Sequence, residues 1–190
     1  MFKFKHKIFI ISGPSGVGKT TLIKYLLKDK KISKILHKLK TYTTRVPRGK
    51  KELEDYYFID KKEFEKLKKE GKLLEYQKIY GDWYGTPLKD VKESLKVSKH
   101  LLLCIDVKGA LKVKRLFEKE VVLIFIAPPG LKELRKRILK RGKINKKELE
   151  ERMRRVKEEL QKSLRFDYIV VNRNLKETVF RIKNIILSLV

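Results

Sequence analysis

Residues 13–20, GPSGVGKT, match the spacing G-x-x-x-x-G-K-[ST] of a phosphate-binding loop. A short apolar run at 7–12 precedes them and a helical pattern at 18–29 follows, which is the context that such a loop requires. Glycines let successive backbone N–H groups turn inward around phosphate oxygens, and the start of the helix adds its positive end. We expect Lys19 to reach the β- and γ-phosphates of ATP, and the Thr20 hydroxyl to ligate Mg²⁺. The predicted ATP-binding residues of this segment are Gly13, Pro14, Ser15, Gly16, Val17, Gly18, Lys19, Thr20 and Thr21.

A second segment, TYTTRVPR at 41–48, contains four hydroxyl-bearing side chains and two arginines, Arg45 and Arg48. The planar guanidinium of arginine stays charged and binds a phosphate group through two parallel hydrogen bonds. Two arginines beside Tyr and Thr hydroxyls therefore predict a second phosphate site, separate from the loop. A protein that holds two phosphates in separate sites is equipped for phosphoryl transfer.

Four further motifs follow along the chain: DYYF at 55–58, LLEYQKIYGDWYGTP at 73–87, IDVKG at 105–109 and FIAPP at 125–129. Together with the phosphate loop and the TTRVPR segment, they occur in the order of the guanylate kinase family and at nearly its spacing. The chain resembles that family over about residues 7–173, and several of these motifs are specific to it rather than to phosphate-loop proteins at large.

The resemblance implies a kinase that transfers the γ-phosphoryl group of ATP to GMP, with dGMP as a further acceptor, and yields ADP and GDP. It implies that Arg45, Arg48, Tyr56 and Tyr84 hold the GMP phosphate, that Thr41, Glu75, Thr86 and Asp106 read the base, and that Asn172 lies beside the adenine of ATP. A carboxylate such as that of Glu75 can accept from both N1–H and the N2 amine of guanine. Adenine has neither donor, so this arrangement favours GMP over AMP.

Transfer between two phosphates needs no strong general base, because the attacking oxygen already belongs to an anionic phosphate. Catalysis then consists mostly of alignment and charge neutralisation. The resemblance implies that a closing lid brings in arginines and excludes water. The catalytic residues it implies are Lys19, Arg45, Arg137, Arg141 and Arg152.

The chain departs from the family pattern at three places. The usual L-D-I-D strand end reads LCID, so Cys104 replaces the first carboxylate, while Asp106 remains. The usual V-N-D-D reads VNRN, which places the positive charge of Arg173 where an acid is common. RGKKELED at 48–55 replaces the common proline-glycine turn before the D-Y-x-F motif. We expect the loop that these residues form to extend a different distance from that of other family members.

Apolar runs alternate with helical patterns, which predicts an α/β fold with a mainly parallel sheet flanked by helices. The predicted strands are 7–12, 101–106, 121–127 and 167–171, and the predicted helices are 18–29, 107–118, 131–140, 147–164 and 175–188. Short alternating stretches around one helix, which begins after Asp60, indicate an inserted mixed lobe. We expect a single domain whose core is about 1–38, 87–140 and 165–190, whose GMP-binding lobe is about 39–86 and whose small helical lid is about 141–164.

Composition limits the partners and the location of the protein. With 50 Lys and Arg against 23 Asp and Glu in 190 residues, the formal net charge is +27, which favours anionic partners. The lysines are spread along the chain and interleaved with Glu, which favours a solvated basic surface over a dedicated nucleic-acid face. A single cysteine suits a reducing compartment, and no apolar run approaches the length of a membrane span. We predict a cytoplasmic protein with no membrane partner. The sequence predicts no particular oligomeric state.

Three other functions fit parts of the sequence. An interaction module that has lost catalysis would usually lack the intact phosphate loop. A kinase for another small phosphate ester, such as a ribose bisphosphate, would not need the guanine-reading residues Thr41, Glu75 and Thr86. A nucleic-acid binder that uses ATP is suggested by net charge alone.

Overall fold

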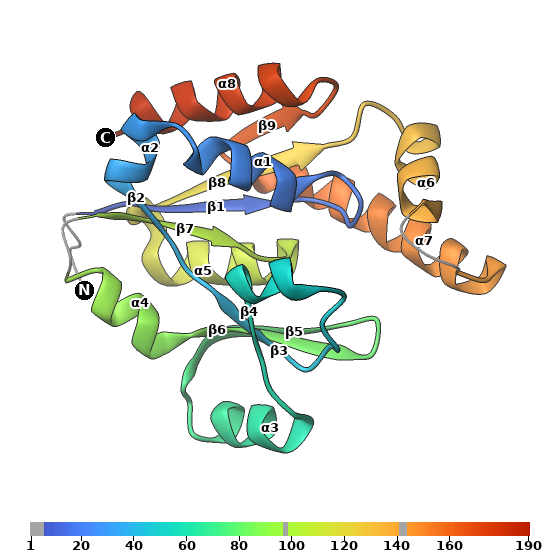
Figure 1. Ribbon diagram of the computed structural model, residues 1–190, viewed down its shortest axis with the longest axis horizontal. Coiled ribbons are helices and arrows are strands. Elements are labelled where there is room, and N and C mark those ends of the chain that lie inside the picture. The colour runs from blue at the N-terminus through green and yellow to red at the C-terminus, as the bar shows by residue number, and fades with distance from the viewer. Residues whose placement is uncertain (1–5, 97–98, 141–143) are drawn as a thin grey trace.

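Two β-sheets organise the residues that the structure, a computed structural model, describes: 6–96, 99–140 and 144–190 (Figure 1). The first sheet has five parallel strands in the order β2-β7-β1-β8-β9, and the second is a mixed sheet in the order β4-β3-β6-β5. The strands are β1 Ile8–Ser12, β2 Leu36–Lys38, β3 Thr41–Thr43, β4 Tyr56–Phe58, β5 Leu73–Ile79, β6 Asp82–Pro87, β7 His100–Cys104, β8 Val121–Ala127 and β9 Tyr168–Val171. The α-helices are α1 Lys19–Leu27, α2 Lys30–Ile35, α3 Lys61–Lys69, α4 Leu88–Ser94, α5 Val107–Phe117, α6 Leu131–Leu139, α7 Lys146–Lys162 and α8 Leu175–Leu187. Three short 3₁₀ helices are Lys50–Glu54, Glu118–Glu120 and Ser163–Arg165.

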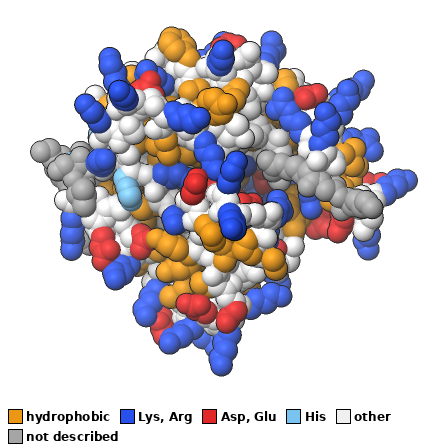
Figure 2. All heavy atoms as spheres, viewed as in Figure 1, with side chains coloured by type: hydrophobic (Ala, Val, Ile, Leu, Met, Phe, Trp, Pro, Cys, Tyr) orange, Lys and Arg blue, Asp and Glu red, His pale blue; other side chains and the backbone are white. Residues whose placement is uncertain are grey.

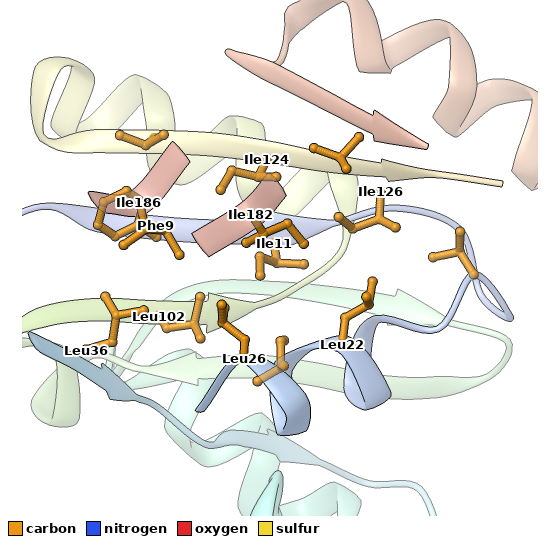
Figure 3. Packing of buried hydrophobic residues seen from close by; sticks show 14 of the residues in the cluster. Phe9, Ile11, Leu22, Leu26, Leu36, Leu102, Ile124, Ile126, Ile182 and Ile186 are labelled. Carbon is orange, nitrogen blue, oxygen red and sulfur yellow. The ribbon is translucent and has the colours of Figure 1, made fainter. Parts of the chain in front are cut away.

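The parallel sheet forms the core because its central strands are buried on both faces. Every residue of β1 and β8 is buried, as continuous apolar runs in parallel sheets require. Alternate side chains point to opposite faces, so Phe9 and Ile11 pack against α1 and α8 (Figure 3), while Ile8 and Ile10 belong to the cluster on the α5 face. This rigid sheet fixes the point at which β1 ends and the phosphate loop begins.

The second sheet is inserted between β2 and α4 of the core. Strand β3 runs parallel to β4 and antiparallel to β6, and a two-residue turn joins β5 to β6. Helix α3 begins at its N-cap Asp60, whose carboxylate accepts from the Glu63 N–H at 2.7 Å, as the sequence predicts. Phe64 of α3 is fully buried and stacks on Trp83 of β6 at 5.7 Å between ring centroids, which holds the helix to the sheet.

The predicted fold class is confirmed, with differences at the ends of elements. The predicted strand 101–106 is wrong at its end, because β7 stops at Cys104 and Asp106 is the N-cap of α5. The sequence-based prediction also lacks α2, β2 and α4. The four predicted strands all lie in the parallel sheet, where the structure arranges them as β7-β1-β8-β9.

Charged side chains are dispersed over the surface. Figure 2 shows Lys and Arg across the visible face, with Asp and Glu between them. Several are paired one helical turn apart, including Arg154 with Glu158 and Arg181 with Glu177. Within the described ranges, no helix is both long and apolar enough to cross a membrane.

Candidate active site

The phosphate loop connects β1 to α1 and depends on glycine at two points. Gly13 has φ +140°, and a Cβ there would lie 2.4 Å from the Ile126 carbonyl oxygen, so only glycine fits between the loop and β8. Gly18 has φ +102° and occupies the N-cap position of α1, where it offers no side chain to the helix. The first N–H groups of α1 therefore face a position suited to an anion.

The side chain of Lys19 lies over this loop. Its Nζ donates to the Gly13 carbonyl at 2.5 Å and to the Pro14 carbonyl at 3.1 Å. These bonds hold the ammonium group at the mouth of the loop, where phosphate oxygens would bind.

Asn172 lies behind the loop and braces it. Its amide donates to the Val17 carbonyl at 2.7 Å, and its Oδ1 accepts from the Thr178 hydroxyl at 3.2 Å. The side chain is buried, and it does not line the cleft described below. The structure thus places Asn172 as a support of the loop, and its predicted contact with adenine stays a prediction.

The predicted acceptor-phosphate residues cluster on the second sheet. Arg45 Nε donates to the Tyr84 hydroxyl at 3.2 Å, and its guanidinium lies 5.7 Å from the Tyr56 ring centroid. Burial raises the pKa of Tyr56, so its phenol stays protonated and able to donate a hydrogen bond. Two phenols and a guanidinium thus lie side by side at the cleft, a set of donors that suits a phosphate group.

Glu52, which the sequence-based prediction lacks, is bound to this cluster. Its two carboxylate oxygens accept from both terminal nitrogens of Arg45 at 3.1 Å, and one also accepts from the Arg48 backbone N–H at 2.8 Å. Burial raises the pKa of Glu52, but the bonds from Arg45 and Arg48 outweigh burial, and the net shift is downward. An ionised carboxylate therefore occupies one bidentate edge of the arginine that is predicted to bind phosphate.

The predicted base-reading residues meet where β5, β6 and the start of α5 converge. Glu75 is buried and accepts from the Thr86 hydroxyl at 2.6 Å. A Cβ on Gly109 would lie 2.4 Å from Glu75 Oε2 and 3.0 Å from Asp106 Oδ1, so both carboxylates lie against this glycine. Burial raises the pKa of Glu75 to about 7, the Thr86 bond opposes that shift, and the charge of Asp106 adds to it. Thr41 is also buried, at the start of β3.

One cleft of about 680 Å³ connects the phosphate loop with both acceptor clusters. Its lining includes these predicted residues: Gly13, Ser15, Gly16, Gly18, Lys19, Thr20, Thr21, Thr41, Arg45, Arg48, Tyr56, Glu75, Tyr84, Asp106 and Arg152. Pro14, Val17, Thr86, Arg137 and Asn172 are predicted site residues that do not line it. Thr86 contributes through its bond to Glu75 instead.

Two of the three predicted lid arginines fall within the described residues. Arg137 of α6 donates to Glu133 at 3.0 Å, and Arg152 of α7 lies 5.1 Å from the ring centroid of Tyr80. Arg141 lies outside the described residues. Arg155, which the sequence-based prediction also lacks, lines the cleft beside Arg152.

The side chains that line the cleft determine how it could hold a metal ion. No group of three or more His, Cys, Asp or Glu in the described part of the chain is placed to hold a metal ion. Thr20 lines the cleft and follows Lys19 directly, and a hydroxyl-bearing residue there suits Mg²⁺ held mainly by the phosphates of a nucleotide. Burial raises the pKa of the Cys104 thiol, so at this departure from the family pattern the protein presents a neutral sulfur rather than a carboxylate.

These features are those of a phosphate-loop kinase that acts on a nucleoside monophosphate: the loop and the residues predicted to bind a second phosphate and a base share a single cleft. The profile of the guanylate kinase family matches residues 5–189. A guanylate kinase of Anaplasma phagocytophilum is 36% identical over 98% of this chain and 88% of its own length, and one of Clostridium tetani is 41% identical over 96% and 86%. The crystal structure of guanylate kinase from Anaplasma phagocytophilum covers 99% of this chain and 88% of its own, with a TM-score of 0.79 and 33% identity.

The chain belongs to the guanylate kinase family, and it is an enzyme that phosphorylates GMP with ATP. The predicted family, fold class and reaction are confirmed. The interaction-module and ribose-phosphate alternatives are not supported, because the loop is intact and the Glu75–Thr86 pair is formed.

Proposed function

We propose that the cleft binds ATP at the phosphate loop and GMP on the second sheet, and that the γ-phosphoryl group passes directly between them. Arg45, Arg48, Tyr56 and Tyr84 bind the GMP phosphate, and Thr41, Glu75, Thr86 and Asp106 read guanine. Lys19 neutralises the transferring group together with the lid arginines Arg137, Arg141 and Arg152. The observation that carries this proposal is the single cleft lined by the loop, by Arg45 and by Glu75.

Mg²⁺ would be held by Thr20 and by the phosphates of ATP. When bound, it would offset negative charge on the phosphates. Because Cys104 stands where a carboxylate is usual, the protein itself supplies few hard oxygen ligands here, and the basic side chains supply much of the charge neutralisation.

The division into a core, a GMP-binding lobe at about 39–86 and a lid at about 141–164 is part of this proposal. The second sheet and α3 supply the lobe. Leu149 in the first half of α7 and Val156 in its second half are both buried in the core cluster, so a movement of the lid would have to carry or release both contacts. We infer a cytoplasmic location and no specific nucleic-acid partner, which the lone cysteine and the dispersed charges support.

A coupled assay of ADP formation tests the proposed function. Purified protein, ATP and Mg²⁺ are combined in turn with GMP, dGMP, AMP, CMP, UMP and a ribose bisphosphate. We expect turnover with GMP and dGMP. Equal turnover with the ribose bisphosphate would show that the proposed base-reading residues do not select the substrate.

The lid arginines should act on the rate rather than on GMP binding. We expect Arg137→Ala or Arg152→Ala to lower kcat by about 10- to 100-fold, less than a lone arginine finger contributes, because several arginines share the charge. The KM for GMP should change by less than about threefold, since these groups act on charge that develops during transfer. Steady-state kinetics with each substrate varied in turn checks this.

Exposed arginines on the same helices serve as controls. Arg135→Ala on α6 and Arg154→Ala on α7 remove the same charge from the surface and should leave kcat unchanged. A lid variant with normal kcat and only weaker GMP binding would contradict the catalytic role and would place that arginine in the acceptor site.

GMP use should depend on pH through Glu75, whose pKa is about 7 in the free protein. Below that pH the carboxyl group is protonated and no longer accepts from both guanine donors, so kcat/KM for GMP should fall as pH falls through about 7. The value of kcat at saturating GMP should vary less, because kcat/KM reports the free enzyme. The GMP phosphate ionises near pH ~6, so Glu75→Gln is the control. The pH profile of kcat/KM for Glu75→Gln should keep the change caused by ionisation of the GMP phosphate and lose the change near pH 7. Identical profiles for the wild type and Glu75→Gln would contradict the assignment of that change to Glu75.

A further inference from the structure

Helix α7 carries two adjacent arginines that point in different directions. Arg154 and Arg155 each pair with a glutamate one turn further on, Glu158 at 2.6 Å and Glu159 at 2.9 Å. The Arg154 side chain is 71% exposed, whereas that of Arg155 is 23% exposed and lines the cleft. The Arg155 side chain therefore extends toward the active site, whereas the Arg154 side chain extends into solvent.

Arg155 reaches one of the proposed guanine-reading carboxylates. Its Nη2 donates to Asp106 Oδ2 at 3.2 Å while its Nε donates to Glu159. The other oxygen of Asp106 accepts from the Gly109 N–H at 2.8 Å at the start of α5. The Asp106 side chain is only 9% exposed, so the guanidinium and the helix N-terminus together determine its position.

Asp106 in turn lies next to Glu75. Both carboxylates border Gly109, where a Cβ would lie 3.0 Å from one and 2.4 Å from the other. Glu75 also faces the hydroxyl of Thr86 on β6 and, at longer range, the ammonium of Lys112 on α5. Two buried carboxylates side by side repel each other, and a cation bound to one of them offsets that repulsion and fixes its rotamer.

The β5–β6 turn adds a contact from the lobe. The Arg155 guanidinium lies 5.5 Å from the ring centroid of Tyr80, a residue with φ +51° in that turn. Arg155 thereby joins helix α7, the end of the core strand β7 and the hairpin of the second sheet. Arginine suits this position because its planar group stays charged, stacks on an aromatic ring and donates in two directions at once.

We propose that Arg155 is a positioning residue for guanine recognition: it holds the Asp106 carboxylate in place beside Glu75 and so connects helix α7 to the GMP site. The proposal rests on the proposed role of Asp106 in binding GMP. It assigns Arg155 a role in substrate binding, distinct from the role of Arg152 in the transfer step.

Kinetics of the full chain tests this proposal. Arg155→Ala should raise the KM for GMP by roughly three- to tenfold, which lies within the range of coupling between residues in direct contact. The KM for ATP and kcat at saturating GMP should stay within about twofold of the wild type, because the phosphate loop is untouched. Arg155→Lys should recover part of the loss, since it keeps the charge but not the two-directional geometry. Arg154→Ala is the matched control and should keep the wild-type KM for GMP.

A double-mutant cycle with Asp106→Asn shows whether Arg155 acts through Asp106. In the Asp106→Asn background, Arg155→Ala should change the KM for GMP by less than about twofold. If Arg155→Ala has the same effect in both backgrounds, or none in the wild type, the proposal is overturned while the GMP site stands. If Asp106→Asn alone leaves the KM for GMP unchanged, the proposed role of Asp106 fails and this proposal fails with it. Arg155→Gln repeats the cycle with a longer side chain should the alanine variant fold poorly.

Discussion

Replacement of Lys19 by alanine should lower kcat by about 10³-fold, the upper range for loss of one group that stabilises transition-state charge. The ammonium group is held at the mouth of the phosphate loop by the Gly13 and Pro14 carbonyls, where it can follow the charge on the transferring phosphoryl group. The free energy of unfolding should change by less than about 1 kcal/mol, since the side chain is outside the apolar core. Turnover by the coupled assay and thermal unfolding of the same sample measure both quantities.

Lys28→Ala is the matched control for this variant. Lys28 is the C-cap residue of α1, at the end of the helix opposite the phosphate loop. It is exposed, and its Nζ lies 4.9 Å from the Tyr25 ring centroid. Its loss removes the same charge and should leave kcat at the wild-type value. A folded Lys19→Ala protein with undiminished turnover would show that the GPSGVGKT segment does not bind the transferred phosphate.

The parallel core could be predicted from sequence because its strands are continuous apolar runs. The run at 121–127 corresponds residue for residue to β8, which is buried along its whole length. The helix predicted at 175–188 begins as expected after Asn174, whose side chain accepts from two N–H groups of its first turn. These signals are local, so they are visible in the sequence itself.

The short elements that the sequence does not reveal depend on distant partners. Strand β2 has only three residues, and it exists because Leu36–Lys38 pairs with β7 across the edge of the sheet. Helix α2 leads into it with no intervening turn residue, so no boundary is visible there. The end of the predicted strand 101–106 is wrong for a different reason. The Asp106 side chain caps α5, and this local hydrogen bonding competes with extension of the strand.

In the active site, spacing within motifs predicts the residues that lie in one cleft, such as Arg45, Tyr84 and Glu75. Arg155 could not be predicted in the same way, because its ion pair is with Asp106, which is distant in the sequence. Glu52 pairs with the nearby Arg45, but neither residue belongs to a motif that specifies this pair. In a chain with 50 basic and 23 acidic residues, a single charged residue gives no signal of its own. For Glu52 one indication existed, since it lies in the RGKKELED segment that departs from the family pattern.

The wild-type enzyme should prefer GMP over AMP by about 10⁴-fold in kcat/KM, as expected where a site is built to bind donors that the analogue lacks. Glu75 is buried with one oxygen bound to Thr86, and its other oxygen lies against Gly109. Adenine would place its unprotonated N1 against this carboxylate, which leaves a buried charge unpaired. Parallel initial-rate measurements with both nucleotides test the preference.

Glu75→Gln should reduce kcat/KM for GMP by about 1.5–3 kcal/mol, the contribution of a hydrogen bond to a charged group. The amide keeps the size of the side chain, but its NH₂ group replaces one accepting oxygen and the charge is lost. Either this NH₂ group faces guanine donors, or it donates to the Thr86 hydroxyl and leaves only a neutral oxygen for guanine. The KM for ATP should change little, because the phosphate loop lies on the other sheet. Thr86→Ala should give a smaller loss of the same kind, since it removes a bond that orients the carboxylate and leaves its charge.

Glu65→Gln on α3 is the control, because it neutralises a carboxylate of the same lobe that is 40% exposed and forms a surface ion pair with Lys68. Such a pair contributes little in water, so GMP kinetics should stay at the wild-type level. The base-reading role of Glu75 would be contradicted by equal activity of the wild type on AMP and GMP. It would equally be contradicted by an unchanged kcat/KM for GMP in Glu75→Gln, because a buried carboxylate that binds two guanine donors cannot lose its charge without effect.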